Sequence, residues 1–417
     1  MHVLQSQLTQ YTLAALLAAF LFWRGIIPGF SRIDSDFPNY YTSARILAEG
    51  KDVRRLYDDR WFQDQIDSYG MEQMGKFSPF PPVTALVLLP LASLEPLDAL
   101  RTMVVINLVL LVLSIRFLSV ILQVPFTAAA IFALLAGLGL ANCFRLGQLY
   151  ILLSFLVIAG YYAYSLGRKT LAGICWGVFV PIKYFPIVIL AYFLFRREWK
   201  VVIAGGCTAV LIALVGLLVL GWDVHREFVS SVLGSHLGSH FSSQNSFSAA
   251  FQSWDSLLRR LFLYDPELNP HPLIAGTAVF LPLKIVILLL QFLAALAAIV
   301  HVHRIKSTNV DQFSIGMLGL TALLLAPGTG TYHFVVLWLP VGLLFFFFLK
   351  RGQSGTAVSL AAAYAAIGFI PYGATRDFDG DGLLTLLAYP RLGLVFAMFL
   401  LTILGVWNRT VPENVQK

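Results

Sequence analysis

The stretch LAGICWGVFVPIKYFPIVILAYFLF (171–195) decides the fold class of this chain. It is long enough to cross a bilayer as a helix, because a span needs roughly 17–25 predominantly apolar residues. Its single charged residue, Lys183, lies between Pro181 and Pro186. Similar apolar runs recur from one end of the sequence to the other. The sequence therefore predicts an all-α polytopic membrane protein.

Composition indicates the same class. The 417 residues are 58% hydrophobic and only 12% charged, with a mean hydropathy of +0.77, whereas soluble chains carry about 25% charged residues. The net charge of +7 does not indicate nucleic-acid binding, because the basic residues form short clusters between apolar runs, as topology signals do. The three cysteines form no CxxC pair, so neither a metal knuckle nor a disulfide framework is indicated.

The apolar runs predict about twelve transmembrane helices in one integral membrane domain covering residues 1–417. The first run lacks a basic n-region and a cleavage site, so we expect it to stay as an anchor. The predicted outer loops are about 31–79, 222–273 and 374–385. The expected spans are about 10–30, 80–96, 98–122, 126–143, 149–166, 171–195, 201–221, 274–300, 313–327, 332–349, 355–373 and 386–406. The alternative for the short ones, 80–96, 126–143 and 313–327, is a broken or partly re-entrant segment whose backbone is covered by protein or a cavity.

The basic clusters orient the chain. Those at 196–200, 303–306 and 350–351 fall on one side if every span crosses, and the positive-inside rule makes that side cytoplasmic. We therefore expect a multi-pass plasma-membrane protein with cytoplasmic N- and C-termini and a site on the outer face. Arg168 and Lys169 fall on the outer side and break the rule. Either one span is miscounted, or these two charges bind anionic groups outside.

The first outer loop predicts two amphipathic helices. Residues 40–47, with Gly50 as a stop, and residues 58–74 have apolar positions at helical spacing. Segments of this kind beside a span usually lie in the plane of the headgroups.

The same loop holds two acids, Asp34 and Asp36, beside the end of the first span. They either solvate the loop or supply a general base whose proton affinity is raised by partial burial. Arg45 and the cations that follow it either hold a phosphate by charge-assisted hydrogen bonds or contact anionic membrane lipids.

Two polar interruptions lie inside apolar text. Lys183 at membrane depth needs a cavity or a partner, and we interpret it as a phosphate-binding or counter-ion group; the alternative is a lysine that reaches the interface from a misplaced span end. Arg145 and Gln148 frame a Gly-containing junction. The junction is either a plain turn or a contact for phosphate and sugar hydroxyls.

The remaining candidates lie further along the chain. His236 and His240 have the spacing of metal ligands on one helix face, but no acid lies near them before Asp255. Asn245 suits hydroxyl recognition or a plain loop, and His333 follows a Pro/Gly-broken span. The segment DFDGDG (377–382) opens like a calcium loop but has Ala388 where a bidentate Glu is required. We expect no metal and no other cofactor.

The order of these segments resembles glycosyltransferase family 87, the polyprenyl-phosphate-sugar-dependent α-mannosyltransferase-like enzymes of the GT-C fold. The residues that carry the resemblance are DFPNYYTSARILAEG (36–50) with Leu56-Tyr57, FSPFPPVTALVLLPLASL (77–94), RLGQLYILL (145–153) and LAGICWGVFVPIKYFP (171–186). Weaker echoes are QNSFSAAF (244–251), which swaps the family's usual Asn-Gln-Ser order, and APGTGTYHF (326–334), which lacks a Trp at Gly330.

The resemblance implies an inverting, metal-independent enzyme that uses a polyprenyl-phosphate-linked sugar and a glycolipid or glycan acceptor. It makes Asp36 the catalytic base, with Asp34 as the alternative, and Lys183 a donor-phosphate or site-organising group. Gln148 and His333 also fall on family-like positions. The expected function is transfer of a hexose, with mannose as the expected sugar; the alternative is a transporter or flippase of a lipid-linked saccharide.

Overall fold

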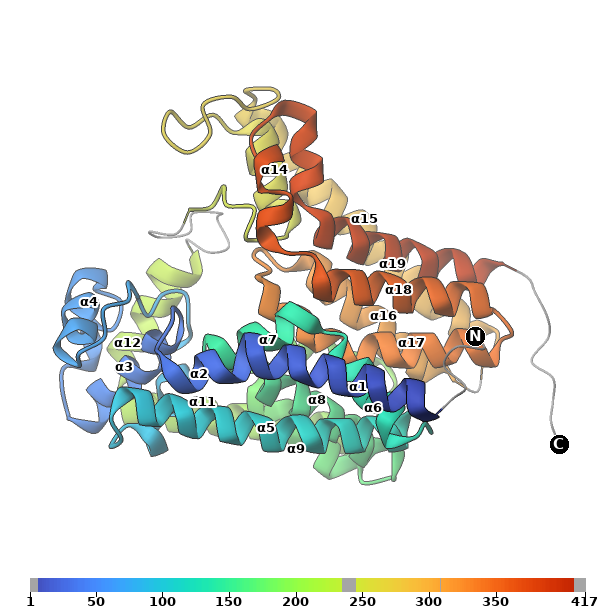
Figure 1. Cartoon of the computed structure of the whole chain (residues 1–417), viewed down its shortest axis with the longest axis horizontal. Coiled ribbons are helices and arrows are strands. Elements are labelled where there is room, and N and C mark those ends of the chain that lie inside the picture. Colours follow the sequence, from blue (N-terminus) through green and yellow to red (C-terminus); the bar gives the residue numbers. More distant parts are fainter. Residues whose placement is uncertain (1–6, 235–244, 308, 409–417) are drawn as a thin grey trace. The chain divides into compact units, whose positions relative to one another are not determined.

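The computed structural model describes residues 7–234, 245–307 and 309–408 (Figure 1). Within these ranges the regular elements are helices, and the one β-bridge is the isolated pair Asp265–Asn269. The chain divides into two compact units, which are described separately. The first unit comprises Met1–Leu134 and Leu140–Ser243, and the second comprises Leu135–Gly139 and Gln244–Lys417. The expected single domain over 1–417 stays a prediction.

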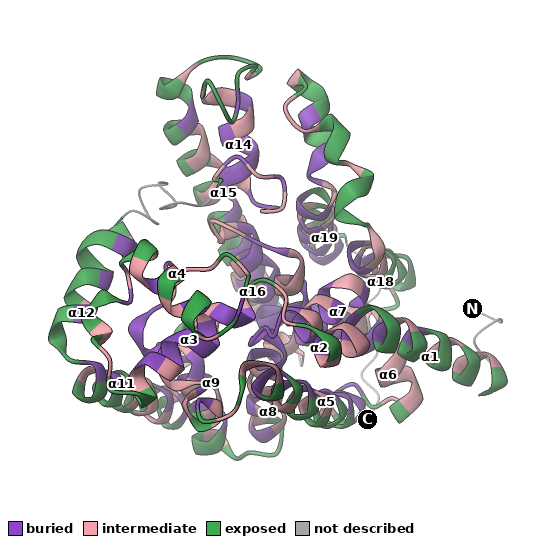
Figure 2. Cartoon of the chain, turned by 60° about the vertical axis from the view of Figure 1, so that its left-hand side comes forward, coloured by how far each residue is buried: buried purple, intermediate pink, exposed green. Residues whose placement is uncertain are grey.

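The predicted all-helical, membrane-embedded class is confirmed. Among the described residues, six helices are long and apolar enough to cross a membrane, and a seventh span results if a helix pair bent by 77° is counted as one. Figure 2 shows exposed residues along α1 (Gln7–Leu21) and α11 (Trp199–Leu220). These include apolar residues such as Leu218, which is 83% exposed. The six are Gln7–Ser31, Pro96–Ile121, Trp199–Leu220, Thr277–Arg304, Thr331–Lys350 and Pro390–Trp407. The predicted count of twelve is not confirmed, because several shorter apolar helices make up the rest.

The first span runs along the first unit, and the loop that follows it lies at one end (Figure 1). The span consists of α1 (Gln7–Leu21), a π-helical turn (Phe22–Ile26) and α2 (Ile27–Ser31). The two helices predicted in the loop are present as α3 (Phe37–Ala48) and α4 (Asp59–Ser68). Gly50 ends α3 as predicted: it has a φ of 66°, and Lys51 N bonds to Ile46 O at 3.0 Å, which is the Schellman pattern.

The expected span at 80–96 does not form. Two short 3₁₀ helices, η4 (Pro82–Leu86) and η5 (Leu89–Leu91), replace it, and both pack against α3. The Tyr41 hydroxyl donates to the Leu94 carbonyl at 2.6 Å, so the end of the segment stays beside α3. Three closely spaced prolines at its start and another at Pro90 remove helical hydrogen-bond donors, which prevents a continuous helix.

Helices α5 to α8 carry the chain between the two ends of the first unit. Arg101 near the start of α5 (Pro96–Ile121) donates to the carbonyl of Phe30 at 3.0 Å, beside the end of the first span. The bent pair is α6 (Phe126–Leu134) and α7 (Gly137–Arg145). Phe117 stacks on Tyr162 with 4.6 Å between ring centroids, which aligns the far end of α5 with that of α8 (Tyr150–Ser165).

The stretch 171–195 is a helical hairpin rather than one span. It contains most of α9 (Lys169–Phe179) and all of α10 (Ile187–Phe195), separated by a non-helical turn at the two prolines. The Lys169 ammonium and the Glu198 carboxylate are 2.7 Å apart, so the hairpin begins and ends at the same end of the unit. Arg168 and Lys169 therefore lie beside the cluster at 196–200. This adjacency favours the first explanation for their anomaly, a miscounted span.

Close helix packing holds this hairpin. Gly173 and Gly177 form a GxxxG pattern on α9, and a Cβ at either position would collide with the Val201 or Gly205 carbonyl of α11 (Trp199–Leu220). Small residues allow such backbone approach between membrane helices. After α11 the first unit ends with α12 (Trp222–Glu227) and a π-helical turn (Phe228–Leu233).

The second unit is an antiparallel helical assembly with a buried charge cluster. Asp255 accepts from Arg259 at 2.7 Å and is ion-paired with Lys284. In the DFDGDG segment, Asp379 pairs with Arg260 at 2.8 Å. The helices are α14 (Trp254–Phe262), α15 (Thr277–Arg304), α16 (Val310–Leu325), α17 (Trp338–Lys350) preceded by the 3₁₀ helix Thr331–Leu337, α18 (Ser354–Phe369) and α19 (Pro390–Trp407).

Candidate functional site

Asp36 occupies an unusual backbone position between α2 and α3. Its φ is 74° and its ψ is −46°, and Phe37 N bonds to Ser35 O at 3.0 Å across it, which forms a γ-turn with positive φ. A non-glycine residue rarely adopts this conformation, and such strain clusters at functional sites. The turn directs the chain into α3, whose start contains Pro38.

The neutral side chain of Gln148 holds the Asp36 carboxylate. Gln148 Nε2 donates to Asp36 Oδ2 at 2.6 Å, while its Oε1 accepts from the Tyr40 hydroxyl at 3.0 Å. Both Gln148 and Tyr40 are buried. Asp36 and Tyr40 lie one helical turn apart, so a single amide connects both ends of the first turn of α3 to the start of α8.

A Schellman turn places Gln148. At the end of α7, Gly147 has a φ of 60° and its N–H bonds to Phe144 O, while Gln148 N bonds to Cys143 O at 2.9 Å. A Cβ on Gly147 would lie 2.8 Å from the ring of Phe37. Glycine is required here both for its backbone conformation and for the approach of α3.

Burial is the main influence on the protonation of Asp36. Desolvation of this half-buried carboxylate raises its pKa above the ordinary aspartate value, because the charged form loses its water. The hydrogen bond from Gln148 lowers the pKa, as do Lys183 and Arg145, and the charge of Asp34 raises it. The net effect is a raised pKa, which makes Asp36 a stronger base than an exposed aspartate.

Lys183, in the turn of the α9–α10 hairpin, acts on the Asp36 carboxylate through its charge and without direct contact. Its ammonium lies 4.4 Å from the ring centroid of Phe80 and 5.4 Å from that of Tyr150. The Phe80 ring in turn packs on Tyr40 at 4.8 Å. Within the described part of the chain no carboxylate lies at ion-pair distance from Lys183. Aromatic faces thus stabilise a cation whose charge interacts with Asp36 across a gap.

Asp34 has a different environment from Asp36. Its Oδ2 pairs with Arg145 Nε at 3.0 Å and lies 3.9 Å from Arg32. Asp34 therefore serves as the partner of two guanidinium groups, whereas Asp36 accepts from a neutral amide. Of the two candidate bases, Asp36 is the one whose charge is less neutralised by its direct contacts.

Arg45 lies in a separate network. It donates to Glu49 at 2.6 Å, to the Tyr41 hydroxyl at 2.8 Å and to the Leu94 carbonyl at 3.2 Å, and it packs over the ring of Tyr69. These contacts tie α3 to the segment after η5. The structure thus gives Arg45 a positioning role, and its predicted contact with donor phosphate stays a prediction.

The other candidate residues either belong to the second unit or lie outside the residues that the structure describes. His333 stacks on Tyr332 with 4.8 Å between centroids, and Asn245 Oδ1 accepts from Phe247 N at 2.9 Å in a local turn. Their predicted roles at the substrate are not tested by these local contacts. His236 and His240 lie outside the described residues.

Two aromatic residues of the site were not predicted from the sequence. Phe80 and Tyr150 flank Lys183, yet in the sequence they read as ordinary apolar positions. Each lies just after a Pro- or Gly-containing junction, which is the one signal that marked them. Together the described contacts define an all-helical membrane protein in which a strained acid faces an aromatic-lined cation.

This chain belongs to glycosyltransferase family 87, because the model of that family matches residues 79–327, which is more than half of the sequence. It is therefore a membrane glycosyltransferase. The matched region contains Arg145, Gln148, Lys183 and Asn245 and stops short of Asp36 and His333. No curated protein matches the sequence.

Proposed function

We propose that this glycosyltransferase moves a hexose, mannose in our assignment, from a polyprenyl-phosphate donor to a lipid or glycan acceptor at the outer face of the plasma membrane. The observation that carries the proposal is the half-buried Asp36 carboxylate, held by Gln148 and facing Lys183. An acid with raised proton affinity beside a cation provides the two charges that sugar transfer from a phosphate requires.

In the proposed step, Asp36 accepts the proton of the acceptor hydroxyl as its oxygen attacks the anomeric carbon. The bond from that carbon to the phosphate oxygen breaks with inversion, and the polyprenyl phosphate leaves with the electron pair. Lys183 and Arg145 would stabilise the negative charge that develops on the leaving phosphate. A single carboxylate suffices, unlike the paired carboxylates of hydrolases.

The charges support an outer-face site. Helix α8 begins at Tyr150, beside Lys183, and ends next to Arg168, about 24 Å further along its axis. With 80–96 removed as a crossing and 171–195 treated as a hairpin, the clusters at 168–169 and 196–200 share the end opposite Asp36. The positive-inside rule makes their end cytoplasmic.

The test compares Asp36→Asn with Asp34→Asn in membranes that receive labelled polyprenyl-phosphate-mannose and an acceptor lipid extract. We expect Asp36→Asn to lose at least about 100-fold in glycoside formation, the usual contribution of a general base, and Asp34→Asn to lose less. Full activity of Asp36→Asn would refute the assignment of the base. Translocation of the labelled lipid without any glycoside would instead establish the flippase alternative.

A further inference from the structure

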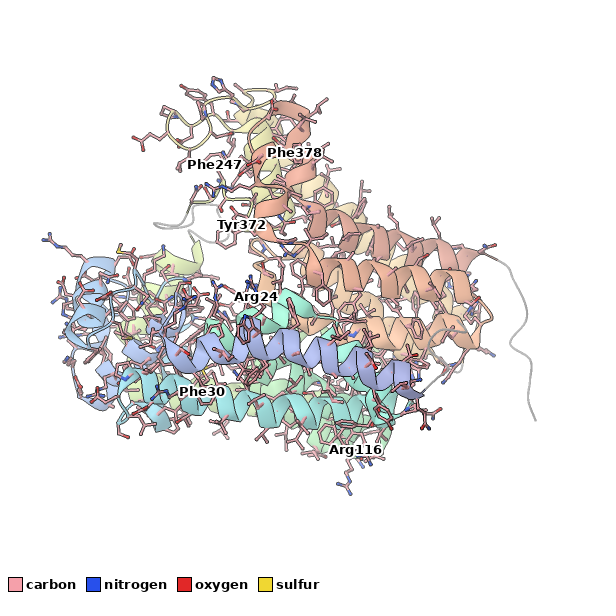
Figure 3. The ribbon with its side chains drawn as sticks, viewed as in Figure 1. Arg24, Phe30, Arg116, Phe247, Tyr372 and Phe378 are labelled. Atoms are coloured by element: carbon pink, nitrogen blue, oxygen red, sulfur yellow. The ribbon has the colours of Figure 1, made fainter. Side chains whose placement is uncertain are left out.

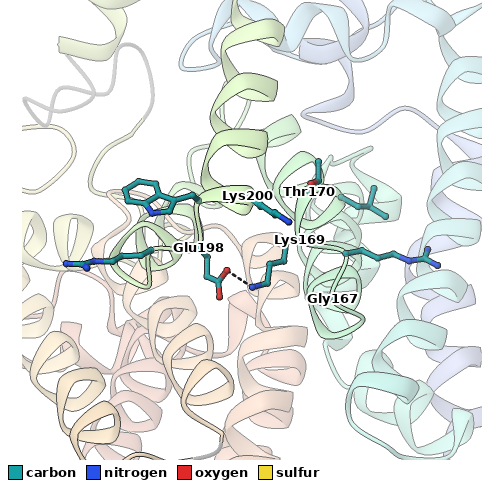
Figure 4. A pocket seen from close by; sticks show the side chains of 9 residues that line it. Gly167, Lys169, Thr170, Glu198 and Lys200 are labelled. Carbon is teal, nitrogen blue, oxygen red and sulfur yellow. Dashed lines mark hydrogen bonds and ion pairs between the residues drawn. The ribbon is translucent and has the colours of Figure 1, made fainter.

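A cavity lies at the end of the first unit opposite Asp36. It has a volume of about 770 Å³ and is lined by residues 167–171, from the α8–α9 turn, and 197–200, from the α10–α11 turn (Figure 4). The sugar-transfer site proposed above uses none of these residues. The hairpin geometry brings the two turns together, whereas the topology expected from the sequence had placed them on opposite sides of the membrane.

Cations dominate the lining. Lys169 is paired with Glu198, as the dashed line in Figure 4 marks. Arg168, Arg197 and Lys200 are exposed and have no carboxylate at ion-pair distance among the described residues. The cavity thus has three unneutralised positive charges, and the first turns of α9 and α11 add backbone N–H groups with no partner inside their own helices.

Arg197 stands where glycine is favoured. Both turns follow the Schellman pattern: Arg168 N bonds to Ala163 O and Glu198 N bonds to Phe193 O, each at 2.9 Å. The residue with positive φ is Gly167 in the first turn, at 75°, and Arg197 in the second, at 57°. Arginine in this conformation is strained relative to glycine, and the fold tolerates the same conformation at Gln123 and Lys306. Glycine can therefore replace Arg197 without loss of the turn.

Apolar side chains surround the charged cavity. Leu166, Phe195 and Trp199 are 52%, 63% and 55% exposed. In a membrane-embedded chain such residues face lipid, and tryptophan is enriched at the level of the headgroups. The cavity therefore lies where phosphate groups of lipids are concentrated, with apolar surface beside it for acyl chains.

We propose that this cavity binds the phosphate group of an anionic phospholipid in the cytoplasmic leaflet. The free cations provide charge-assisted hydrogen bonds to the phosphate oxygens, and the exposed apolar rim packs against the acyl chains. A soluble phosphate compound would meet the same cations but would gain nothing from the rim, which is why the lipid is the favoured source.

The test uses the full-length protein in phosphatidylcholine nanodiscs with or without a minority of phosphatidylglycerol. Thermal unfolding and the lipid retained in native mass spectrometry are measured for wild type, Arg197→Gly and Lys200→Gln. Inorganic pyrophosphate, added to phosphatidylcholine nanodiscs, probes the soluble source. Arg197→Gly is informative because it removes the guanidinium with its side chain while the positive φ of 57° suits glycine, so loss of the fold is not expected.

We expect phosphatidylglycerol to stabilise the wild type and each variant to bind it roughly fivefold more weakly, as loss of one basic residue at an anionic membrane predicts. The control is Arg116→Gln, which removes an exposed charge near the same end but outside the cavity (Figure 3). Stabilisation by pyrophosphate that the same variants weaken would assign the phosphate site to a soluble compound. Unchanged phosphatidylglycerol binding in both variants, or equal loss in Arg116→Gln, would overturn the proposal.

Discussion

Replacement of Gln148 by leucine tests the proposed base without touching it. The substitution keeps a buried side chain of similar size and removes two hydrogen bonds, one to Asp36 Oδ2 at 2.6 Å and one from the Tyr40 hydroxyl at 3.0 Å. Because the amide donates to the carboxylate, its loss selectively destabilises the charged form of Asp36. The rate should therefore need a higher pH to reach its plateau.

The magnitude follows from the geometry. A hydrogen bond to a charged acceptor contributes about 1.5–3 kcal/mol, and about 1.4 kcal/mol corresponds to one pH unit. The acid limb of kcat/KM should thus move upward by about one to two pH units. The unfolding free energy should also fall by about 1–3 kcal/mol, because the Tyr40 hydroxyl is left buried without its acceptor.

The pH dependence of kcat/KM with labelled donor measures this shift, and Tyr40→Phe is the matched control. That variant removes the other bond of the same amide and leaves the donation to Asp36 in place. We expect it to lose stability to a similar extent while its acid limb stays at the wild-type pH. Coincident acid limbs for Gln148→Leu and wild type, or an equal shift in Tyr40→Phe, would refute the role of Asp36.

Three further substitutions follow from the site. Lys183→Met should raise the KM for the donor roughly tenfold or more, since it removes a charge-assisted contact; an unchanged KM would leave Lys183 a structural residue. Arg45→Ala should cost about 1–3 kcal/mol in unfolding free energy with donor KM unchanged, whereas the exposed Arg54→Ala should cost almost nothing. Asp36→Asn should be more stable than wild type at neutral pH: the pKa of Asp36 is raised in the folded state, so folding loses stability as pH rises through that pKa, and equal stability at all pH values would contradict the burial argument.

The sequence predicted those features that depend on local patterns. Composition alone set the helical membrane class, and the apolar spacing of 40–47 with Gly50 predicted α3 and its end. The pairing of Asp36 with Gln148 and Lys183 depends on contacts between residues more than a hundred positions apart, so no local pattern could show their geometry. The resemblance to the family supplied these residues, and the structure supplied their arrangement.

Hydropathy failed where a short apolar segment does not cross. The segment 80–96 and the stretch 171–195 are each apolar enough to be taken for a membrane span. The first nevertheless packs against α3, and the second turns at its prolines. Hydropathy measures whether a segment is compatible with lipid, but it does not show whether the segment forms a helix that continues across the membrane. The two prolines were visible in the sequence, but prolines indicate a break or a kink in a helix and do not by themselves predict that the chain reverses.

The two errors cancel in the placement of charge along the first unit. The expected crossings at 80–96 and 171–195 together leave the side of 196–200 unchanged, but they put Arg168 and that cluster on opposite sides of the membrane. The hairpin instead brings Lys169 and Glu198 within 2.7 Å at one end of the unit. In the folded unit the hairpin takes Lys183 to the level of Tyr150 and Asp36 while its two ends stay among the cations of the opposite end. The ammonium of a lysine at such a turn is not exposed to hydrocarbon, because the aromatic rings beside it and the charge of Asp36 stabilise it. The break in the helix is therefore what allows one cation to reach an acid on the far side of a membrane-embedded unit.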